Sequence, residues 1–111
     1  MALSTLAQAV AERFKKRIVG DFPGRILEVR VFGSMARGDA TDASDLDLFV
    51  LVDAPEGSLD DPIISAACDI YREFDFPFPI SPHIMSRGHF EELIRRERLL
   101  AHDILHEGIS I

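Results

Sequence analysis

The sequence predicts an α+β domain in which helices pack on a small mixed β-sheet. Apolar residues recur at three- and four-residue steps in residues 3–19 and 62–74, which indicates amphipathic helices. Aliphatic and aromatic residues dominate residues 25–32 and 44–52, which is typical of strands. The order helix, strand, strand, helix, strand, helix favours α+β, and we expect residues 1–111 to form a single domain with one core.

The two clearest helices have recognisable beginnings. Residues 3–19 carry the first apolar stripe, and Ser4 is placed to cap it. Residues 62–74 carry the second stripe. Its capping residue is expected to be Asp60 or Asp61, with a proline at the first helical position.

The strands differ in their expected burial. Residues 48–52 are apolar throughout, as in a strand that is covered on both faces. Residues 79–86 are extended, but three prolines lie in or just before them, so we expect an edge strand or a strand with a bulge. The apolar positions after Gly88 predict one or two terminal helices.

Composition excludes several classes of function. The chain has 12 Lys and Arg against 19 Asp and Glu, a net charge of −7, so bulk binding of nucleic acid is not expected. No apolar run approaches the roughly 20 residues of a membrane helix. The one cysteine, Cys68, cannot form an internal disulfide and is expected to pack as a small hydrophobe. These features predict a cytoplasmic protein without a membrane span.

Two aspartates interrupt the apolar stretch at residues 44–52. Asp45 and Asp47 are two residues apart, so in a strand they share one face, with Cα atoms about 6.6 Å apart. At that separation two unit charges repel by about 2.5 kcal/mol for an effective dielectric of about 20. Two carboxylates without a Cys or His cluster favour a hard ion, Mg²⁺ or Mn²⁺, that also binds substrate phosphates. We therefore expect a nucleoside triphosphate at this face.

A glycine turn precedes the aspartates. Gly33 ends a predicted strand and permits close backbone approach, and the amides and the hydroxyl of Ser34 can bind phosphate oxygens. Arg37 adds a forked, permanently charged donor. Taken singly, Gly33-Ser34 is an ordinary turn, the two aspartates are solvated charges on an edge strand, and Arg37 is a surface arginine. Together, at this spacing, they favour a nucleotide site.

The segment FGSMARGDATDASDLDLFVLV, residues 32–52, resembles the signature of the DNA polymerase beta-like nucleotidyltransferase superfamily. The short chain is similar to the minimal nucleotidyltransferase (MNT) branch of that superfamily. The resemblance implies a nucleotidyltransferase fold in which Gly33 and Ser34 hold the triphosphate and Arg37 assists. It also implies that Asp45 and Asp47 carry two Mg²⁺ ions. The implied reaction transfers a nucleoside monophosphate, AMP if ATP is the substrate, to a hydroxyl, and pyrophosphate leaves.

The same resemblance implies a protein partner. MNT proteins similar to this one are often encoded beside a helical HEPN protein and act as its antitoxin, some by adenylylating a tyrosine of that partner. We therefore expect a HEPN-type partner or a homo-oligomer to supply part of the site.

One expected residue type is missing. Active members of the superfamily usually carry a third carboxylate on a later strand, but residues 79–86 contain no Asp or Glu. Alternation places Ser81, His83 and Met85 on one face, so His83 is the titratable residue available as a base or metal ligand. Its plain alternative is an edge-strand histidine without a role. Asp75 lies in the loop before the strand and is a less direct substitute.

The sequence thus leaves more than one function open. The first is a metal-dependent nucleotidyltransferase of low activity. The alternative is a non-catalytic antitoxin or scaffold that binds a HEPN-type partner and nucleotide. A third is an aminoglycoside-type nucleotidylating enzyme, for which 111 residues leave little room to bind an acceptor.

Overall fold

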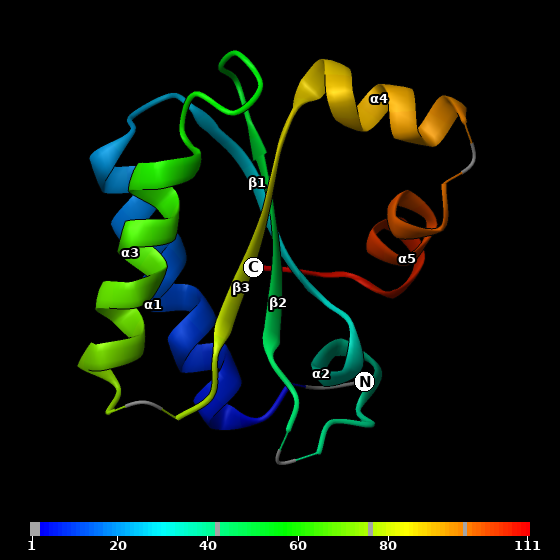
Figure 1. Cartoon of the computed structure of the whole chain (residues 1–111). Coiled ribbons are helices and arrows are strands. Elements are labelled where there is room, and N and C mark those ends of the chain that lie inside the picture. Colours follow the sequence, from blue (N-terminus) through cyan, green and yellow to red (C-terminus); the bar gives the residue numbers. More distant parts are fainter. Residues whose placement is uncertain (1–2, 42, 76, 97) are drawn as a thin grey trace.

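The structure, a computed structural model, describes residues 3–41, 43–75, 77–96 and 98–111. Helices and strands are interspersed along the chain, and no described strand separates the last two helices (Figure 1). In chain order the elements are α1 (Thr5–Asp21), β1 (Ile26–Phe32), α2 (Ser34–Arg37), β2 (Leu46–Val52), α3 (Asp60–Glu73), β3 (Ile80–Ser86), α4 (Arg87–Arg95), α5 (Leu99–Glu107) and β4 (Ile109–Ser110).

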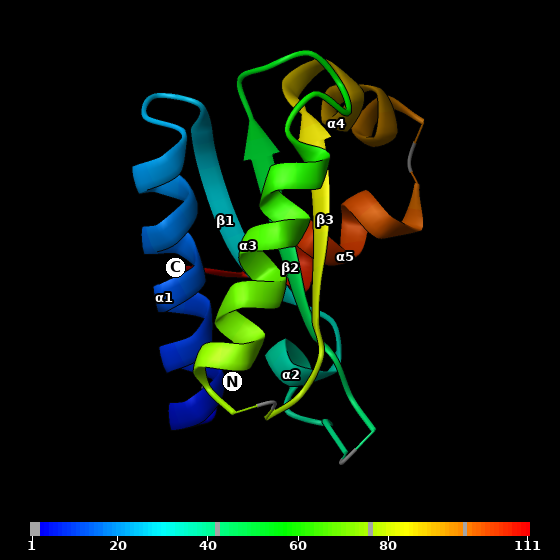
Figure 2. The ribbon, with the colours of Figure 1, turned by 60° about the vertical axis from the view of Figure 1, so that its left-hand side comes forward.

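The strands form one mixed sheet in the order β3-β2-β1-β4. β1 pairs with β2 and with β4 in antiparallel fashion, whereas β2 and β3 run parallel. β3 lies at one edge, as its prolines predict. Helices α1 and α3 cover one face of the sheet, and α4 and α5 lie on the other (Figures 1 and 2). The predicted mixed sheet with helices packed on it is confirmed.

The central strand β2 is buried from both sides, as its apolar composition predicts. Leu46, Leu48, Val50 and Val52 belong to the core between the sheet and helices α1 and α3. Phe49 points to the opposite face and packs in a second, smaller cluster beneath α4 and α5. Burying each of these side chains contributes about 1.5–3 kcal/mol. The second cluster also contains Phe32, Met85, Phe90, Ala101 and Ile104.

The predicted N-terminal cap of α1 is confirmed, whereas the predicted cap of α3 is wrong. The Ser4 side chain accepts a hydrogen bond from the Ala7 N–H at 3.1 Å and caps α1 as predicted. The predicted aspartate cap of α3 is wrong. Leu59 precedes that helix, and its carbonyl accepts the Ile63 N–H at 3.1 Å, so Asp60 and Asp61 already lie in the first turn. There their charge stabilises the positive end of the helix dipole.

Cys68 also differs from the prediction. It is free and exposed. The buried stripe of α3 runs through Ile63, Ala66, Ala67 and Ile70, and position 68 falls beside that stripe. Within the described residues, no helix is both long and apolar enough to cross a membrane.

Candidate functional site

The glycine turn and the aspartates meet at one end of the sheet. β1 ends at Phe32 and β2 begins at Leu46, and in the antiparallel register Phe32 lies opposite Asp47. The turn that follows β1 therefore lies beside the start of β2. Because these are the two central strands, both segments are fixed by the buried sheet.

Two structural features of position 33 require a glycine. Its backbone has φ 76° and ψ −158°, a region that is essentially restricted to glycine. A Cβ at this position would overlap Oδ2 of Asp47 and would lie 3.3 Å from its Cγ. The bare backbone of Gly33 thus lets the Asp47 carboxylate lie directly against the turn.

Helix α2 is a single short turn that starts at Ser34. The Arg37 N–H donates to the Gly33 carbonyl at 3.1 Å, and the Gly38 N–H donates to the Ser34 carbonyl at 3.0 Å. The first amides of such a turn have no carbonyl four residues earlier within the helix. They are therefore free to bind anionic oxygens, as the sequence predicts for Ser34.

The two aspartates are placed differently from one another. Asp47 is the second residue of β2, on the face opposite the main core, and its side chain is 29% exposed. The prediction that Asp45 also lies inside this strand is wrong, because β2 begins one residue later. A turn closed by Ser44 N–H to the Thr41 carbonyl, at 3.0 Å, leads directly into Asp45. Asp45 is exposed and lies next to the strand end.

His83 contacts Asp47 from the neighbouring strand. Its Nε2 lies 3.4 Å from Oδ1 of Asp47, and the imidazole side chain is 34% exposed. The ring also meets Phe32 edge-on, with centroids 4.9 Å apart. Asp47 therefore has Gly33 beside one carboxylate oxygen and His83 beside the other. The sequence places His83 on the correct face, as Met85 on the same face packs in the smaller cluster.

Arg37 lies at the end of α2 and is paired with two acids. Its Nη1 is 3.2 Å from Oε2 of Glu107, and its Nε is 3.3 Å from Oδ2 of Asp39. The hydrogen bonds with Glu107 and then Asp39 raise the pKa of Arg37 above its ordinary value, so the guanidinium stays charged. Its side chain is 41% exposed. A phosphate bound at this position would compete with Glu107 and Asp39 for the guanidinium of Arg37.

Glu107 is the contact that the sequence did not predict. It is 70 positions from Arg37, and nothing in either local pattern links them. This ion pair holds the guanidinium of Arg37 close to α2, of which Arg37 is the last residue.

The side chains of the site suit a metal ion that takes its remaining ligands from water and from the phosphates of a substrate. Among the residues that the structure describes, no three His, Cys, Asp or Glu side chains are grouped to hold an ion by themselves. Mg²⁺ and similar ions are commonly bound by one or two carboxylates together with waters and substrate phosphates. Asp47 against the bare Gly33 backbone provides such a carboxylate next to the turn that the sequence predicts to bind phosphate.

Solved structures of other proteins share this fold, among them the three that follow. The chain is similar to a candidate minimal nucleotidyltransferase, with 26% identity over 95% of each chain and a TM-score of 0.56. It also resembles a toxin–antitoxin structure with AMP-PNP, at 19% identity over 89% of this chain and 70% of that one, TM-score 0.55. A mutant MntA–HpeT toxin–antitoxin structure gives 17% identity over 90% and 70%, TM-score 0.54. No curated protein matches the sequence.

The match extends to the sequence itself. A family model described as the nucleotidyltransferase domain matches residues 5–105, which run from α1 into α5 and include every predicted site residue. The first of the solved structures confirms the resemblance to the minimal branch. The chain belongs to the nucleotidyltransferase domain family.

Proposed function

We propose that this chain is a divalent-metal-dependent nucleotidyltransferase that transfers AMP from ATP to a hydroxyl of a partner protein. The observation that carries the proposal is the contact between Gly33 and Asp47. It brings a phosphate-binding turn and a carboxylate together at one end of the central strands.

The chain binds the triphosphate through α2. The first amides of the turn and the Ser34 hydroxyl hold phosphate oxygens, and the missing side chain of Gly33 lets those oxygens approach the backbone. Arg37 turns from Glu107 or Asp39 and adds a bidentate contact. With a net charge of −7 overall, the chain needs this local donor set to hold an anion.

Asp45 and Asp47 hold the divalent ion, which when bound neutralises phosphate charge during in-line displacement. His83 supplies a nitrogen donor beside them. Its Nε2 is 3.4 Å from Oδ1 of Asp47, close to the spacing of about 3 Å between neighbouring ligands of one ion. Nitrogen ligands favour Mn²⁺ and the later divalent ions over Mg²⁺. We therefore expect Mn²⁺ to be bound in preference to Mg²⁺.

The transfer needs only ATP and the acceptor hydroxyl as reactants. The acceptor oxygen forms a bond to the α-phosphorus, and the bond from that phosphorus to the bridging oxygen of pyrophosphate breaks. The hydroxyl proton passes to water. Gly33, Ser34 and Arg37 orient the triphosphate so that the pyrophosphate leaves opposite the incoming oxygen.

The choice of ATP and of a protein partner is supported by the solved toxin–antitoxin structures with the same fold. One toxin–antitoxin structure of the same fold was solved with AMP-PNP, an ATP analogue, which supports ATP as the nucleotide. Two of the neighbours are toxin–antitoxin structures, which supports a protein partner. We propose a HEPN-type toxin as that partner, with a tyrosine hydroxyl as the acceptor.

The test compares two labels of ATP. The purified chain, Mn²⁺ and the protein encoded by the adjacent gene are incubated with ATP labelled in either the α- or the γ-phosphate. We expect only the α-label to enter the partner, and Asp47→Asn to abolish the incorporation. Asp53→Asn is the matched control, because Asp53 is an exposed aspartate just after the other end of β2. Incorporation of the γ-label, or of neither label, would contradict the proposal.

The alternative is a non-catalytic antitoxin that retains the fold. It is favoured by the absence of a third carboxylate from β3, where His83 stands instead. In that case Asp47→Asn would leave inhibition of the partner intact, whereas the enzymatic proposal requires inhibition to be lost together with the label.

A further inference from the structure

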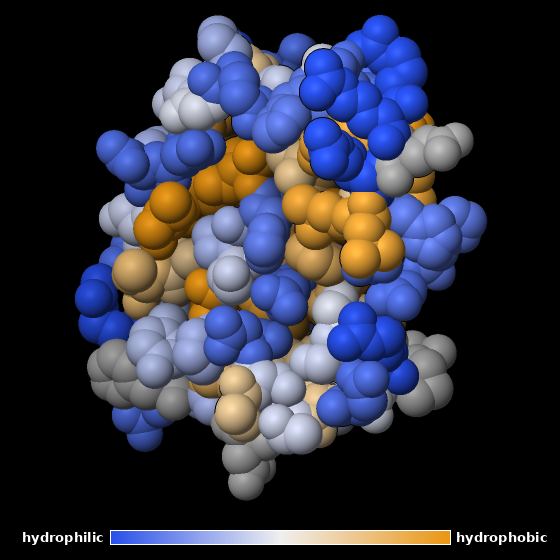
Figure 3. Space-filling view, turned by 45° about the vertical axis from the view of Figure 1, so that its right-hand side comes forward, coloured by the Kyte–Doolittle hydropathy of each residue, from blue (hydrophilic) through white to orange (hydrophobic). Residues whose placement is uncertain are grey.

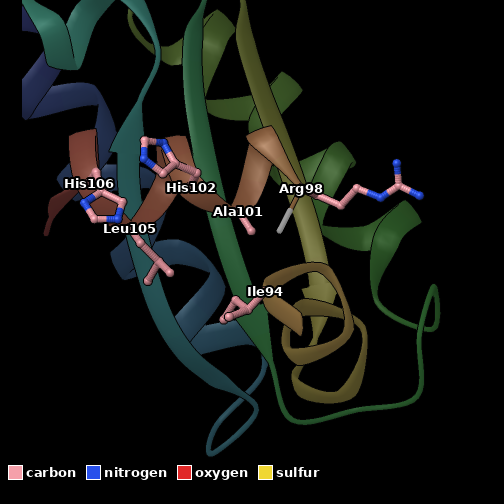
Figure 4. Close-up of a pocket in the computed structure, with 6 residues that line it drawn as sticks. All are labelled: Ile94, Arg98, Ala101, His102, Leu105 and His106. Atoms are coloured by element: carbon pink, nitrogen blue, oxygen red, sulfur yellow. The ribbon is translucent and has the colours of Figure 1, made fainter. Parts of the chain in front are cut away.

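Helix α5 carries two histidines on one face, away from the carboxylate site. His102 and His106 are four residues apart, which places them one turn apart on the helix. Their ring centroids are 4.3 Å apart and the ring planes are 29° from parallel. Figure 4 shows both rings on the same helix, next to each other.

The pair borders a hollow between α4 and α5. The hollow has a volume of ≈ 360 Å³. On this side of the molecule apolar surface is surrounded by polar residues (Figure 3), and the exposed side chains include Ile94 and Leu105. The cation of the hollow, Arg98, extends away from the two imidazoles (Figure 4). The residues that line it are Ile94, Arg98, Ala101, His102, Leu105 and His106.

Both rings are open to solvent. The side chain of His102 is 61% exposed, and His106 is also exposed. Nδ1 of His102 lies 3.7 Å from Oδ1 of Asp103, which is too long for a hydrogen bond. Both imidazoles are therefore accessible to an ion from solvent.

The spacing suits chelation of one ion. Residues four apart on a helix have Cβ atoms about 5–6 Å apart. A metal–nitrogen bond is about 2.0–2.1 Å, so two imidazoles on such a base reach a common ion by small side-chain rotations. Two nitrogen donors select borderline transition ions rather than Mg²⁺.

We propose that His102 and His106 form a binding site for one divalent transition ion, such as Zn²⁺ or Ni²⁺. The ion takes one nitrogen from each imidazole, and water fills its remaining positions. The site shares no residue with the proposed nucleotide site. His106 lies next to Glu107, the acid that holds Arg37, so the two sites are neighbours along α5.

The test is a calorimetric titration of the full chain with Ni²⁺ alone, without nucleotide. Asp47→Asn is used as the background, since it disables the carboxylate site and leaves α5 unchanged. In this background we expect one Ni²⁺ per chain, with binding weakened about tenfold or more by either His102→Ala or His106→Ala.

His89→Ala is the matched control, because His89 is an exposed histidine of α4 that pairs with Glu56 instead of another histidine. It should leave Ni²⁺ binding unchanged. Both α5 histidines are exposed, so their variants should unfold at the same urea concentration as the parent in the absence of metal. Ni²⁺ binding that survives both α5 variants, or that is lost equally in His89→Ala, would overturn the proposal. Because ATP is absent, that outcome would leave the proposed transfer reaction untouched.

Discussion

Replacing Gly33 by alanine tests the central contact of the site. The backbone at φ 76° and ψ −158° is essentially restricted to glycine, so alanine costs about 1–3 kcal/mol of stability. The added Cβ also overlaps Oδ2 of Asp47 and must displace that carboxylate. We expect Gly33→Ala both to destabilise the fold and to weaken binding of Mn²⁺ with ATP at least about tenfold, or about 1.4 kcal/mol.

Gly24→Ala separates these two effects. Gly24 has a similar φ of +75°, but a Cβ there would have nothing within 4 Å. It should therefore lose about 1–2 kcal/mol for the left-handed backbone and no binding. Urea denaturation measures the free energy of unfolding of each variant, and calorimetry measures its affinity for ATP with Mn²⁺.

Either of two results would contradict a role for the Gly33–Asp47 contact in binding. If Gly33→Ala binds ATP and Mn²⁺ as tightly as the wild type, the Gly33–Asp47 contact has no part in the site. If Gly24→Ala loses binding to the same extent, the loss follows from general destabilisation instead of from the displaced carboxylate.

Three further predictions follow from named contacts. Asp45→Asn should weaken Mn²⁺ binding about tenfold, measured by electron paramagnetic resonance of the free ion. His83→Asp should shift the preference from Mn²⁺ towards Mg²⁺, measured by competition between the two ions, because an oxygen donor replaces nitrogen. Partial burial raises the pKa of Glu56, but hydrogen bonds from Ser86 and His89 outweigh it and lower that pKa overall. A lowered carboxyl pKa stabilises the fold at neutral pH, and this contribution disappears as the pH falls through the folded-state pKa. Glu56→Gln should therefore be less stable than wild type at about pH 7 by less than about 1 kcal/mol, and this difference should shrink as the pH falls through the folded-state pKa, in urea denaturation.

The parts predicted well from sequence are those set by local patterns. The apolar stripe of α1 and its cap at Ser4 depend on residues within one or two turns. The mixed sheet follows from the strand patterns and from the prolines that restrict β3 to an edge. The sequence predicts that Gly33 and Asp47 serve one nucleotide site, and their direct approach follows from the antiparallel pairing that brings the end of β1 to the start of β2.

The parts that could not be predicted depend on contacts between distant residues or on the geometry of turns. The Arg37–Glu107 pair exists because α5 packs against β1, which neither local sequence indicates. β4 is two residues long and has no pattern of its own, and it forms because β1 offers a free edge. Asp45 lies outside β2 because pairing with β3 starts only at Leu46.

The proximity of His83 to Asp47 lies between these cases. Alternation along β3 gives the correct face for His83, whereas its height along β2 depends on the parallel register, in which Phe49 is paired with His83. That register brings the imidazole within 3.4 Å of Oδ1 of Asp47. Because His83 lies beside Asp47, the candidate metal site contains a nitrogen donor in addition to its carboxylates.

The most direct test of a joint nucleotide and metal site is the affinity of the chain for ATP, measured by calorimetry with and without Mn²⁺, for the wild type and Asp47→Asn. We expect the wild type to bind ATP with Mn²⁺ and Asp47→Asn to weaken this binding at least about tenfold. We also expect Asp47→Asn to bind ATP no more tightly with Mn²⁺ than without it. Equal affinity of the two proteins for ATP with Mn²⁺ would contradict a joint nucleotide and metal site at Gly33 and Asp47.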